Sequence, residues 1–273
     1  MTARPNSVPP HFLGGSGSAL VLLHGLSMSW RVWQPVLPML TDRHRTFAPT
    51  LLGHKGAAHT ARETQLTVDL LADVVCAQLD EMDIESAHMA GNSLGGWVAI
   101  ELARRGRALS VTALSPAGAW ARTRDAWRLK SLFRIGFAAS RCSLLEELMA
   151  RPAVRRHLLR NLAVRADLMT AEQVGVMLED MVACTSHEKF LVDLSRNGPL
   201  RELDPAPCPI RLAWSSLDRT LPFTRYGRPM ASLIPDAEVV MLPGVGHVPM
   251  YDDPQLVAKT ILDLTALVDS TES

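Results

Sequence analysis

The sequence predicts an α/β fold in which a mostly parallel central sheet carries helices on both faces and an all-helical cap is inserted between two strands. Continuous apolar runs of strand length, such as residues 19–23, are typical of strands buried on both faces of a parallel sheet. These runs alternate with segments of helical periodicity, which favours parallel strand pairing. No convincing strand occurs between residues 119 and 197. We therefore expect a core domain made of residues 1–118 and 199–273 and a cap made of residues 119–198.

Short apolar runs bounded by turn residues define the strands of the core. The expected strands are residues 19–23, 46–49, 87–90, 110–115, 210–215 and 237–242. Residues 12–18 leave room for one short, poorly defined edge strand, so the sheet is expected to begin late.

Helices are expected where apolar residues recur every three or four positions. In the core these are residues 30–40, with Pro35 and Pro38 as interruptions, and 66–82, 97–107, 224–233 and 254–268. In the cap they are residues 127–139, 144–149, 153–162, 171–184 and 188–195. Residues 151–160 are rich in arginine, which is compatible with an anionic partner, but a solvated helix face is the simpler interpretation.

One short stretch, Gly-Asn-Ser-Leu-Gly-Gly at residues 91–96, joins an expected strand to an expected helix. Glycine at positions 91 and 95 permits a turn in which side chains on either side of Ser93 would collide with backbone. This G-x-S-x-G pattern predicts a nucleophile elbow with Ser93 at its tip. The alternative is a glycine-rich turn whose serine serves only as a helix cap.

Two further residues follow the ends of later strands. Asp218 comes just after the strand at 210–215, and His247 lies in the loop after the strand at 237–242. Ligands of open α/β sheets bind at these carboxyl ends. A serine hydroxyl needs a base to take its proton, imidazole is suited to that task, and a carboxylate fixes the imidazole tautomer. The sequence therefore predicts a triad of Ser93, Asp218 and His247.

The first buried strand ends in His24-Gly25-Leu26 at the same edge of the sheet. The backbone N–H groups of Leu26 and Leu94 are expected to form an oxyanion hole, and His24 is expected to bind loop backbone. Met28 and Trp30 follow this loop and, with Met177 and Met181 of the cap, are candidates to line the substrate pocket; the alternative for each is packing in the interior.

Composition limits the partners and the compartment. The formal net charge is +0 and aromatic residues make up 5% of the 273 residues, so no broad electrostatic footprint for nucleic acid or an acidic membrane is present. The four cysteines are widely separated and lack C-x-x-C spacing, which favours free thiols. No apolar run suits a signal peptide or a bilayer span, so a cytoplasmic protein is expected. No metal and no nucleotide cofactor are expected, because ligand spacing and glycine-rich phosphate motifs are missing. Oligomeric state is left open.

Taken together, five motifs resemble those of one family. They are Leu-Leu-His-Gly at 22–25, Gly-His-Lys-Gly at 53–56, the stretch 91–96, Asp218 with Pro222, and Gly246-His247 followed by Asp253-Pro254. The sequence is similar to the α/β-hydrolase superfamily, in the branch of esterases, lactonases, carbon–carbon bond hydrolases and cofactor-free haloperoxidases with a helical cap. The resemblance assigns nucleophile, acid and base to Ser93, Asp218 and His247.

A serine at position 93 argues against the epoxide hydrolases and haloalkane dehalogenases of this family, which use a carboxylate nucleophile. The expected activity is hydrolysis of a small to medium, mostly apolar ester, thioester or lactone through an acyl-enzyme, with a small-molecule acyl substrate as the partner. Two alternatives stay open: a carbon–carbon bond hydrolase acting on a diketone, and a ligand-binding receptor that retains a slow triad.

Overall fold

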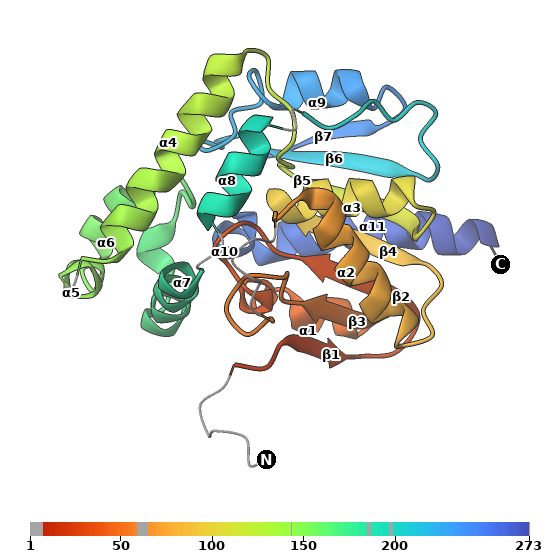
Figure 1. The fold of residues 1–273 in the computed structure, drawn as a ribbon. Coiled ribbons are helices and arrows are strands. Elements are labelled where there is room, and N and C mark those ends of the chain that lie inside the picture. Colours follow the sequence, from red (N-terminus) through yellow and green to blue (C-terminus); the bar gives the residue numbers. More distant parts are fainter. Residues whose placement is uncertain (1–7, 59–64, 143, 185–186, 197–198, 273) are drawn as a thin grey trace.

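Seven strands form one sheet in the order β1-β3-β2-β4-β5-β6-β7 in the computed structural model, which describes residues 8–58, 65–142, 144–184, 187–196 and 199–272 (Figure 1). The strands are β1 (His11–Gly14), β2 (Ser18–Leu23), β3 (His44–Pro49), β4 (Ala87–Asn92), β5 (Ala108–Leu114), β6 (Ile210–Ser215) and β7 (Glu238–Leu242). Only the pairing of β1 with β3 is antiparallel, and every other neighbouring pair is parallel. The expected fold class is confirmed.

The central strand β2 shows why the sheet needs helices on both faces. Leu20 and Leu22 belong to one buried cluster, whereas Val21 and Leu23 belong to another. Successive side chains of a strand point to opposite faces, so an uninterrupted apolar run requires cover on each side. Helices α2, α3 and α9 contribute to the cluster of Val21, and α1 and α11 contribute to the cluster of Leu20.

The helices of the core lie close to their expected positions. They are η1 (Trp30–Trp33), α1 (Leu37–Thr41), α2 (Val68–Asp80), α3 (Leu94–Arg104), α9 (Gly227–Leu233), α10 (Pro249–Asp252) and α11 (Pro254–Glu272). The expected helix at 30–40 is divided into η1 and α1, with Pro38 in the first turn of α1, where its missing N–H does no harm. The short α10 was not expected, because four residues are too few for a periodic signal.

All helices between β5 and β6 gather at one side of the sheet (Figure 1). They are α4 (Thr123–Ser140), α5 (Leu145–Met149), α6 (Pro152–Leu158), η2 (Ala166–Leu168), α7 (Ala171–Ala183) and α8 (His187–Arg196). The boundaries of the cap at residues 119 and 198 stay predictions, since residues 197–198 lie outside the described residues, as do residues 1–7 of the polar N-terminus.

The cap has its own interior. A buried cluster joins α5, the segment after α6 and α7 through residues such as Met149, Leu159 and Met177. The guanidinium of Arg155 is buried among these helices and donates to the carbonyl oxygens of Met149, Ala166 and Asp167. Arg155 thus joins the end of α5 to η2.

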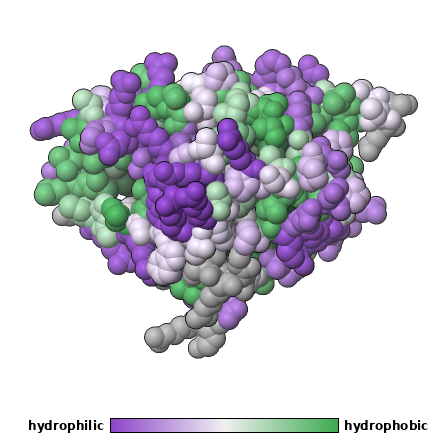
Figure 2. Space-filling view, turned by 90° about the horizontal axis from the view of Figure 1, so that it is seen from above, coloured by the Kyte–Doolittle hydropathy of each residue, from purple (hydrophilic) through white to green (hydrophobic). Residues whose placement is uncertain are grey.

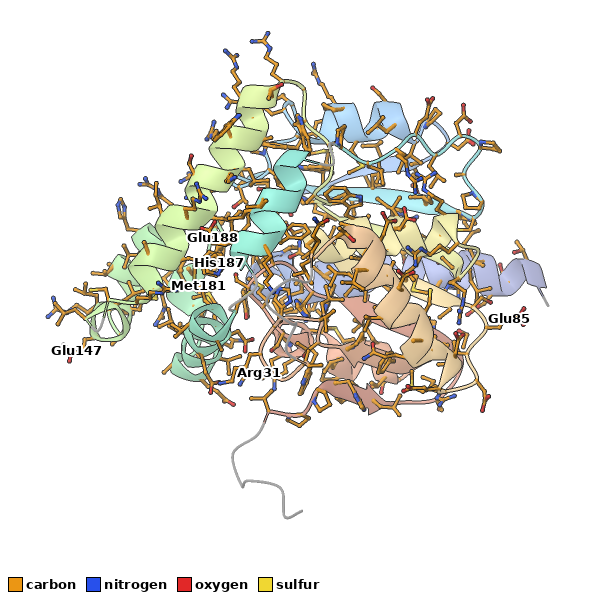
Figure 3. All side chains as sticks on the ribbon, viewed as in Figure 1. Arg31, Glu85, Glu147, Met181, His187 and Glu188 are labelled. Atoms are coloured by element: carbon orange, nitrogen blue, oxygen red, sulfur yellow. The ribbon has the colours of Figure 1, made fainter. Side chains whose placement is uncertain are left out.

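On its other side, the cap packs α4 against α7 and α8. His187 stacks on Phe137 with ring centroids 3.7 Å apart, and Arg134 pairs with Glu188 (Figure 3). In the part of the chain that the structure describes, none of the helices combines the length and apolarity that a bilayer span requires.

Candidate active site

Ser93 sits at the turn between β4 and α3 in a strained backbone conformation, with φ 55° and ψ −113°. A Cβ on Gly91 would overlap the carbonyl oxygen of Gly95, and a Cβ on Gly95 would overlap that of Leu23. Only glycine permits these approaches, because any other residue would place its Cβ inside a neighbouring backbone group. The strand and helix on each side hold Ser93 in this conformation.

The hydroxyl of Ser93 is not used as a helix cap, although the residue occupies the cap position of α3. The serine is 5% exposed and borders an internal cavity. Gly25 lies beside it, since a Cβ on Gly25 would meet the Cβ of Ser93 at 3.4 Å. This contact brings the loop of Leu26 next to the serine. No hydrogen bond from the N–H of Leu26 or Leu94 to an acceptor is found among the described residues, a condition that the expected oxyanion hole requires.

Asp218 and His247 are joined by a hydrogen bond of 2.7 Å between Nδ1 of the imidazole and Oδ2 of the carboxylate. The other oxygen of Asp218 accepts the N–H groups of Thr220 at 2.9 Å and Leu221 at 2.7 Å. These two bonds fix the carboxylate, so that Oδ2 is aimed at the histidine. Both side chains are almost fully buried, and His247 borders the same cavity as Ser93. The structure therefore brings the three residues of the expected triad to one end of the sheet.

Asn92, a residue that the sequence analysis did not single out, links the histidine to the elbow. Its amide nitrogen donates to the carbonyl oxygens of His247 at 2.9 Å and Leu114 at 3.1 Å. The residue is buried, so both bonds are shielded from water. Asn92 thereby holds the backbone of the histidine loop against β4. The position before the serine in the elbow motif was the only available signal for this role.

Asp252 is a second residue that the sequence analysis missed. Its carboxylate accepts the N–H of Gly246 at 2.7 Å on the core side and the N–H groups of Val164 at 3.0 Å and Arg165 at 2.7 Å on the cap side. Two further bonds join the same segments: Val248 N–H donates to Leu162 at 2.8 Å and the Thr220 hydroxyl donates to Asn161 at 2.7 Å. Cap residues 161–165 are therefore fastened to the loops that carry Asp218 and His247.

Helix α7 is fastened to the core at another point, by charged groups. Asp180 is buried and accepts a hydrogen bond of 2.6 Å from the Ser29 hydroxyl. It also forms an ion pair with Arg31, which is labelled in Figure 3. Next to it, Glu179 pairs with Arg31 and Lys55. Burial raises the pKa of the Asp180 carboxyl, whereas the bonds from Ser29 and Arg31 act in the opposite direction.

A cavity of about 180 Å³ lies between the elbow and the cap. Its core wall holds Gly25, Leu26, Ser27, Met28, Asn92, Ser93, Thr220, His247 and Val248. Its cap wall holds Leu132, Phe133, Gly136, Ala139, Leu145, Met149, Leu158, Leu159, Asn161, Leu162, Met177, Leu178 and Met181. Polar groups are concentrated on the core wall and apolar side chains on the cap wall, and no Lys, Arg, Asp or Glu of the described chain borders the cavity.

The structure brings three of the four expected pocket residues, Met28, Met177 and Met181, to the cavity. It does not bring Trp30 there. The Ser29 hydroxyl caps η1 and the chain turns, so that the indole of Trp30 donates to the carbonyl oxygen of Pro9 at 3.0 Å and packs on Phe12. Trp30 therefore covers the edge of the sheet.

His24 binds loop backbone, as expected. Its Nδ1 donates to the Gly25 carbonyl and its Nε2 accepts the Leu51 N–H, each at 2.8 Å. His54 packs edge-on against it with ring centroids 4.8 Å apart. Burial lowers the pKa of His54 to about 4 and holds the pKa of His24 well below its usual value, so both rings are neutral near pH 7. No cluster of three metal-binding side chains occurs in the described ranges.

Comparison with known proteins gives one consistent family. The family model described as "Alpha/beta hydrolase family" matches residues 20–260. The chain is 34% identical to epoxide hydrolase EphH of Mycobacterium tuberculosis over 200 residues, which cover 70% of this chain and 92% of that protein.

Two solved structures share the fold. The enol-lactonase from Burkholderia xenovorans LB400 matches with a TM-score of 0.71 at 20% identity, covering 94% of this chain and 95% of that one. The 2-hydroxy-6-oxo-6-phenylhexa-2,4-dienoate hydrolase from Rhodococcus sp. strain RHA1 matches with a TM-score of 0.74 at 20% identity, covering 94% of each chain. With the family match over most of its length, the chain belongs to the alpha/beta hydrolase family and is a hydrolase of that fold.

Proposed function

We propose that this protein is a cofactor-independent serine hydrolase that cleaves a small to medium, mostly apolar ester, thioester or lactone. The observation that carries the proposal is the buried 2.7 Å bond between His247 and Asp218 at the cavity that Ser93 also borders. A carboxylate in this position keeps the Nδ1 proton on the imidazole and leaves Nε2 unprotonated to act as a base.

The geometry supports a two-step acyl transfer. Ser93 Oγ attacks the substrate carbonyl while its proton passes to Nε2 of His247, and the resulting oxyanion accepts the N–H groups of Leu26 and Leu94. Collapse of this intermediate expels the alcohol or thiol, which takes the proton from His247, and leaves an ester on Ser93. Water then attacks that ester with His247 as base, and the acid leaves.

The similarity to a protein named epoxide hydrolase raises a second candidate reaction. A serine that opened an epoxide would form an alkyl ether, and an ether has no carbonyl carbon for water to attack. Turnover would stop after one event. The serine at the tip of the elbow therefore favours acyl substrates over epoxides.

The cavity also bears on the carbon–carbon bond hydrolase alternative. The Rhodococcus relative acts on a dienoate by its name, and a dienoate carries a carboxylate. A buried carboxylate needs a positive partner, yet neither Lys nor Arg borders the cavity in the described chain. The apolar cap wall favours an uncharged acyl group instead.

The test compares two substrates and two proteins. We expect the wild-type chain to hydrolyse p-nitrophenyl butyrate and to leave styrene oxide unchanged, and we expect Ser93→Ala to lose at least about a thousandfold in kcat on the ester. Epoxide turnover that survives Ser93→Ala would overturn the proposal. Stoichiometric acylation of Ser93 without turnover would instead support the receptor alternative.

A further inference from the structure

The outer surface of the first half of the cap exposes large apolar side chains. They are Trp127 and Ile135 on α4, Leu144 and Leu148 at α5, Leu158 on α6 and Leu168 on η2. Ile135 is 68% exposed and Trp127 is 60% exposed, values that are unusual for side chains of this size. We call this surface, formed by exposed residues of 122–168, the cap outer face.

The cap outer face is also strongly basic. Between residues 122 and 168 the sequence holds eleven Lys and Arg but only four Asp and Glu, although the net charge of the whole chain is +0. Nine of these basic residues are exposed: Arg122, Arg124, Arg128, Arg134, Arg141, Arg151, Arg156, Arg160 and Arg165. Arg134 and Arg156 pair with Glu188 and Asp167. At the left end of Figure 2, on the side where α4 to α6 lie in Figure 1, hydrophobic and hydrophilic surface alternate over short distances. The even charge balance of the chain therefore conceals a local excess.

The cavity lies against helices of this same part of the cap. Ala139 of α4 and Leu158 of α6 both border the cavity, and both are exposed to solvent. The helices that carry the cap outer face therefore also supply part of the apolar wall of the cavity that Ser93 borders.

We propose that the cap outer face binds the surface of an anionic phospholipid membrane. Surfaces that bind membranes peripherally combine a basic fringe, which attracts anionic headgroups, with large apolar side chains that enter the boundary of the acyl chains. Trp127 suits this boundary, because its ring is apolar and its indole N–H is polar.

Two other occupants fit the surface less well. A second copy of the chain related by a two-fold axis would place the basic surface against itself, and like charges at close range oppose association. A nucleic acid would match the charge, but Trp127 is the one aromatic ring among the six exposed apolar side chains named above, and the five aliphatic ones offer no surface on which successive bases can stack. The combination of aliphatic and cationic groups favours lipid.

The test measures co-sedimentation of the full chain with vesicles of phosphatidylcholine alone or with phosphatidylglycerol. We expect binding only to vesicles that contain phosphatidylglycerol, with an affinity that falls as salt rises. The double variant Trp127→Ser/Ile135→Ser and the double variant Arg124→Ser/Arg128→Ser should each lose at least about tenfold in partition coefficient. Leu267→Ser and Arg45→Ser, which alter exposed residues outside the cap, are the matched controls and should bind normally.

The outcome is decided without catalysis, so it is separate from the proposed hydrolysis. Hydrolysis of a soluble short-chain ester should be unchanged in all variants, which shows that they fold. Failure of the wild-type chain to bind anionic vesicles, or equal loss in the controls, contradicts the proposal. A dimer in sedimentation velocity that the Trp127→Ser/Ile135→Ser variant dissociates would assign the surface to a second copy and also overturn it.

Discussion

The core and the cap border the same cavity but are built on different constraints. In the core, backbone approaches backbone so closely at Gly91 and Gly95 that no other residue fits, and both carboxylate oxygens of Asp218 accept hydrogen bonds. In the cap, a Cβ on Gly175 would meet nothing within 4 Å, and a Cβ on Gly136 would meet only the flexible end of the Met181 side chain. Under the proposed function, the core therefore holds the reacting groups in one conformation, whereas the cap wall tolerates changes of side chain that would alter the choice of substrate.

Glycine substitutions test this contrast with the largest expected effect. Gly95→Ala places a Cβ against the Leu23 carbonyl, and we expect a loss of more than about 3 kcal/mol in the free energy of unfolding. Gly175→Ala in α7 meets nothing within 4 Å and should gain up to about 1 kcal/mol from helix propensity. Urea unfolding of both variants measures the difference. Equal free energies of unfolding for the two variants would contradict the claim that the core is packed more tightly than the cap at these glycines.

The pH dependence of stability should come from the core rather than the cap. Burial lowers the pKa of His54 to about 4 from an ordinary value of 6.5, so the unfolded chain binds the proton more readily. Stability is complete above about pH 6.5 and is lost as pH falls toward 4, by about 1.4 kcal/mol per unit for this residue. Chemical unfolding at pH 7, 6 and 5 measures this effect. Between pH 7 and pH 5, the free energy of unfolding should fall less in His54→Asn than in the wild-type chain.

The matched control is His157→Asn, which alters an exposed histidine on α6 of the cap. Its free energy of unfolding should fall with decreasing pH as steeply as that of the wild-type chain. A weaker pH dependence in His157→Asn, but not in His54→Asn, would place the acid-sensitive element in the cap.

Asp252→Ala tests the connection between the two regions. The variant leaves the N–H groups of Gly246, Val164 and Arg165 without their acceptor, and we expect a loss of about 2 kcal/mol in stability. Because Gly246 precedes His247, kcat on a soluble ester should fall more than KM rises.

Asp253→Ala is the control for that variant, since Asp253 accepts only the Leu256 N–H at the start of α11 in the described structure. It should cost about 1 kcal/mol as a lost helix cap and leave kcat unchanged. Identical kinetics in the two variants would show that the cap does not position the histidine loop.

Gly136→Ala should produce the smallest effect and the one most specific to substrate. The residue borders the cavity inside α4, where a Cβ would meet Cε of Met181 at 3.2 Å (Figure 3). We expect kcat/KM to fall by about tenfold for the longest accepted acyl chain and to stay unchanged for acetate esters. Gly175→Ala adds the same methyl away from the cavity and should leave the chain-length profile unchanged; a shift in both variants would contradict a role for cavity shape.

Features of the fold and the site that depend on a local sequence pattern could be predicted, whereas contacts between distant residues could not. The strands, the elbow and the positions of Asp218 and His247 could be predicted, because each depends on a local pattern read at a strand end. Two contacts between core and cap could not be predicted: the ion pair of Asp180 with Arg31 and the hydrogen bond from Val164 to Asp252. In each pair the residues are far apart in sequence, and their spacing carries no periodic signal. Trp30 was expected in the pocket on proximity alone, and the Ser29 cap turns it away.

The central claim is that Ser93 is the nucleophile and that the buried pair of His247 and Asp218 activates it. The most direct measurement is the rate of labelling by a fluorophosphonate, with the modified residue identified by peptide mass spectrometry. We predict a single label on Ser93 and a rate about a thousandfold or more lower in Asp218→Asn, because the amide no longer holds the productive imidazole tautomer. A label on another residue, or an unchanged rate in Asp218→Asn, would contradict the account.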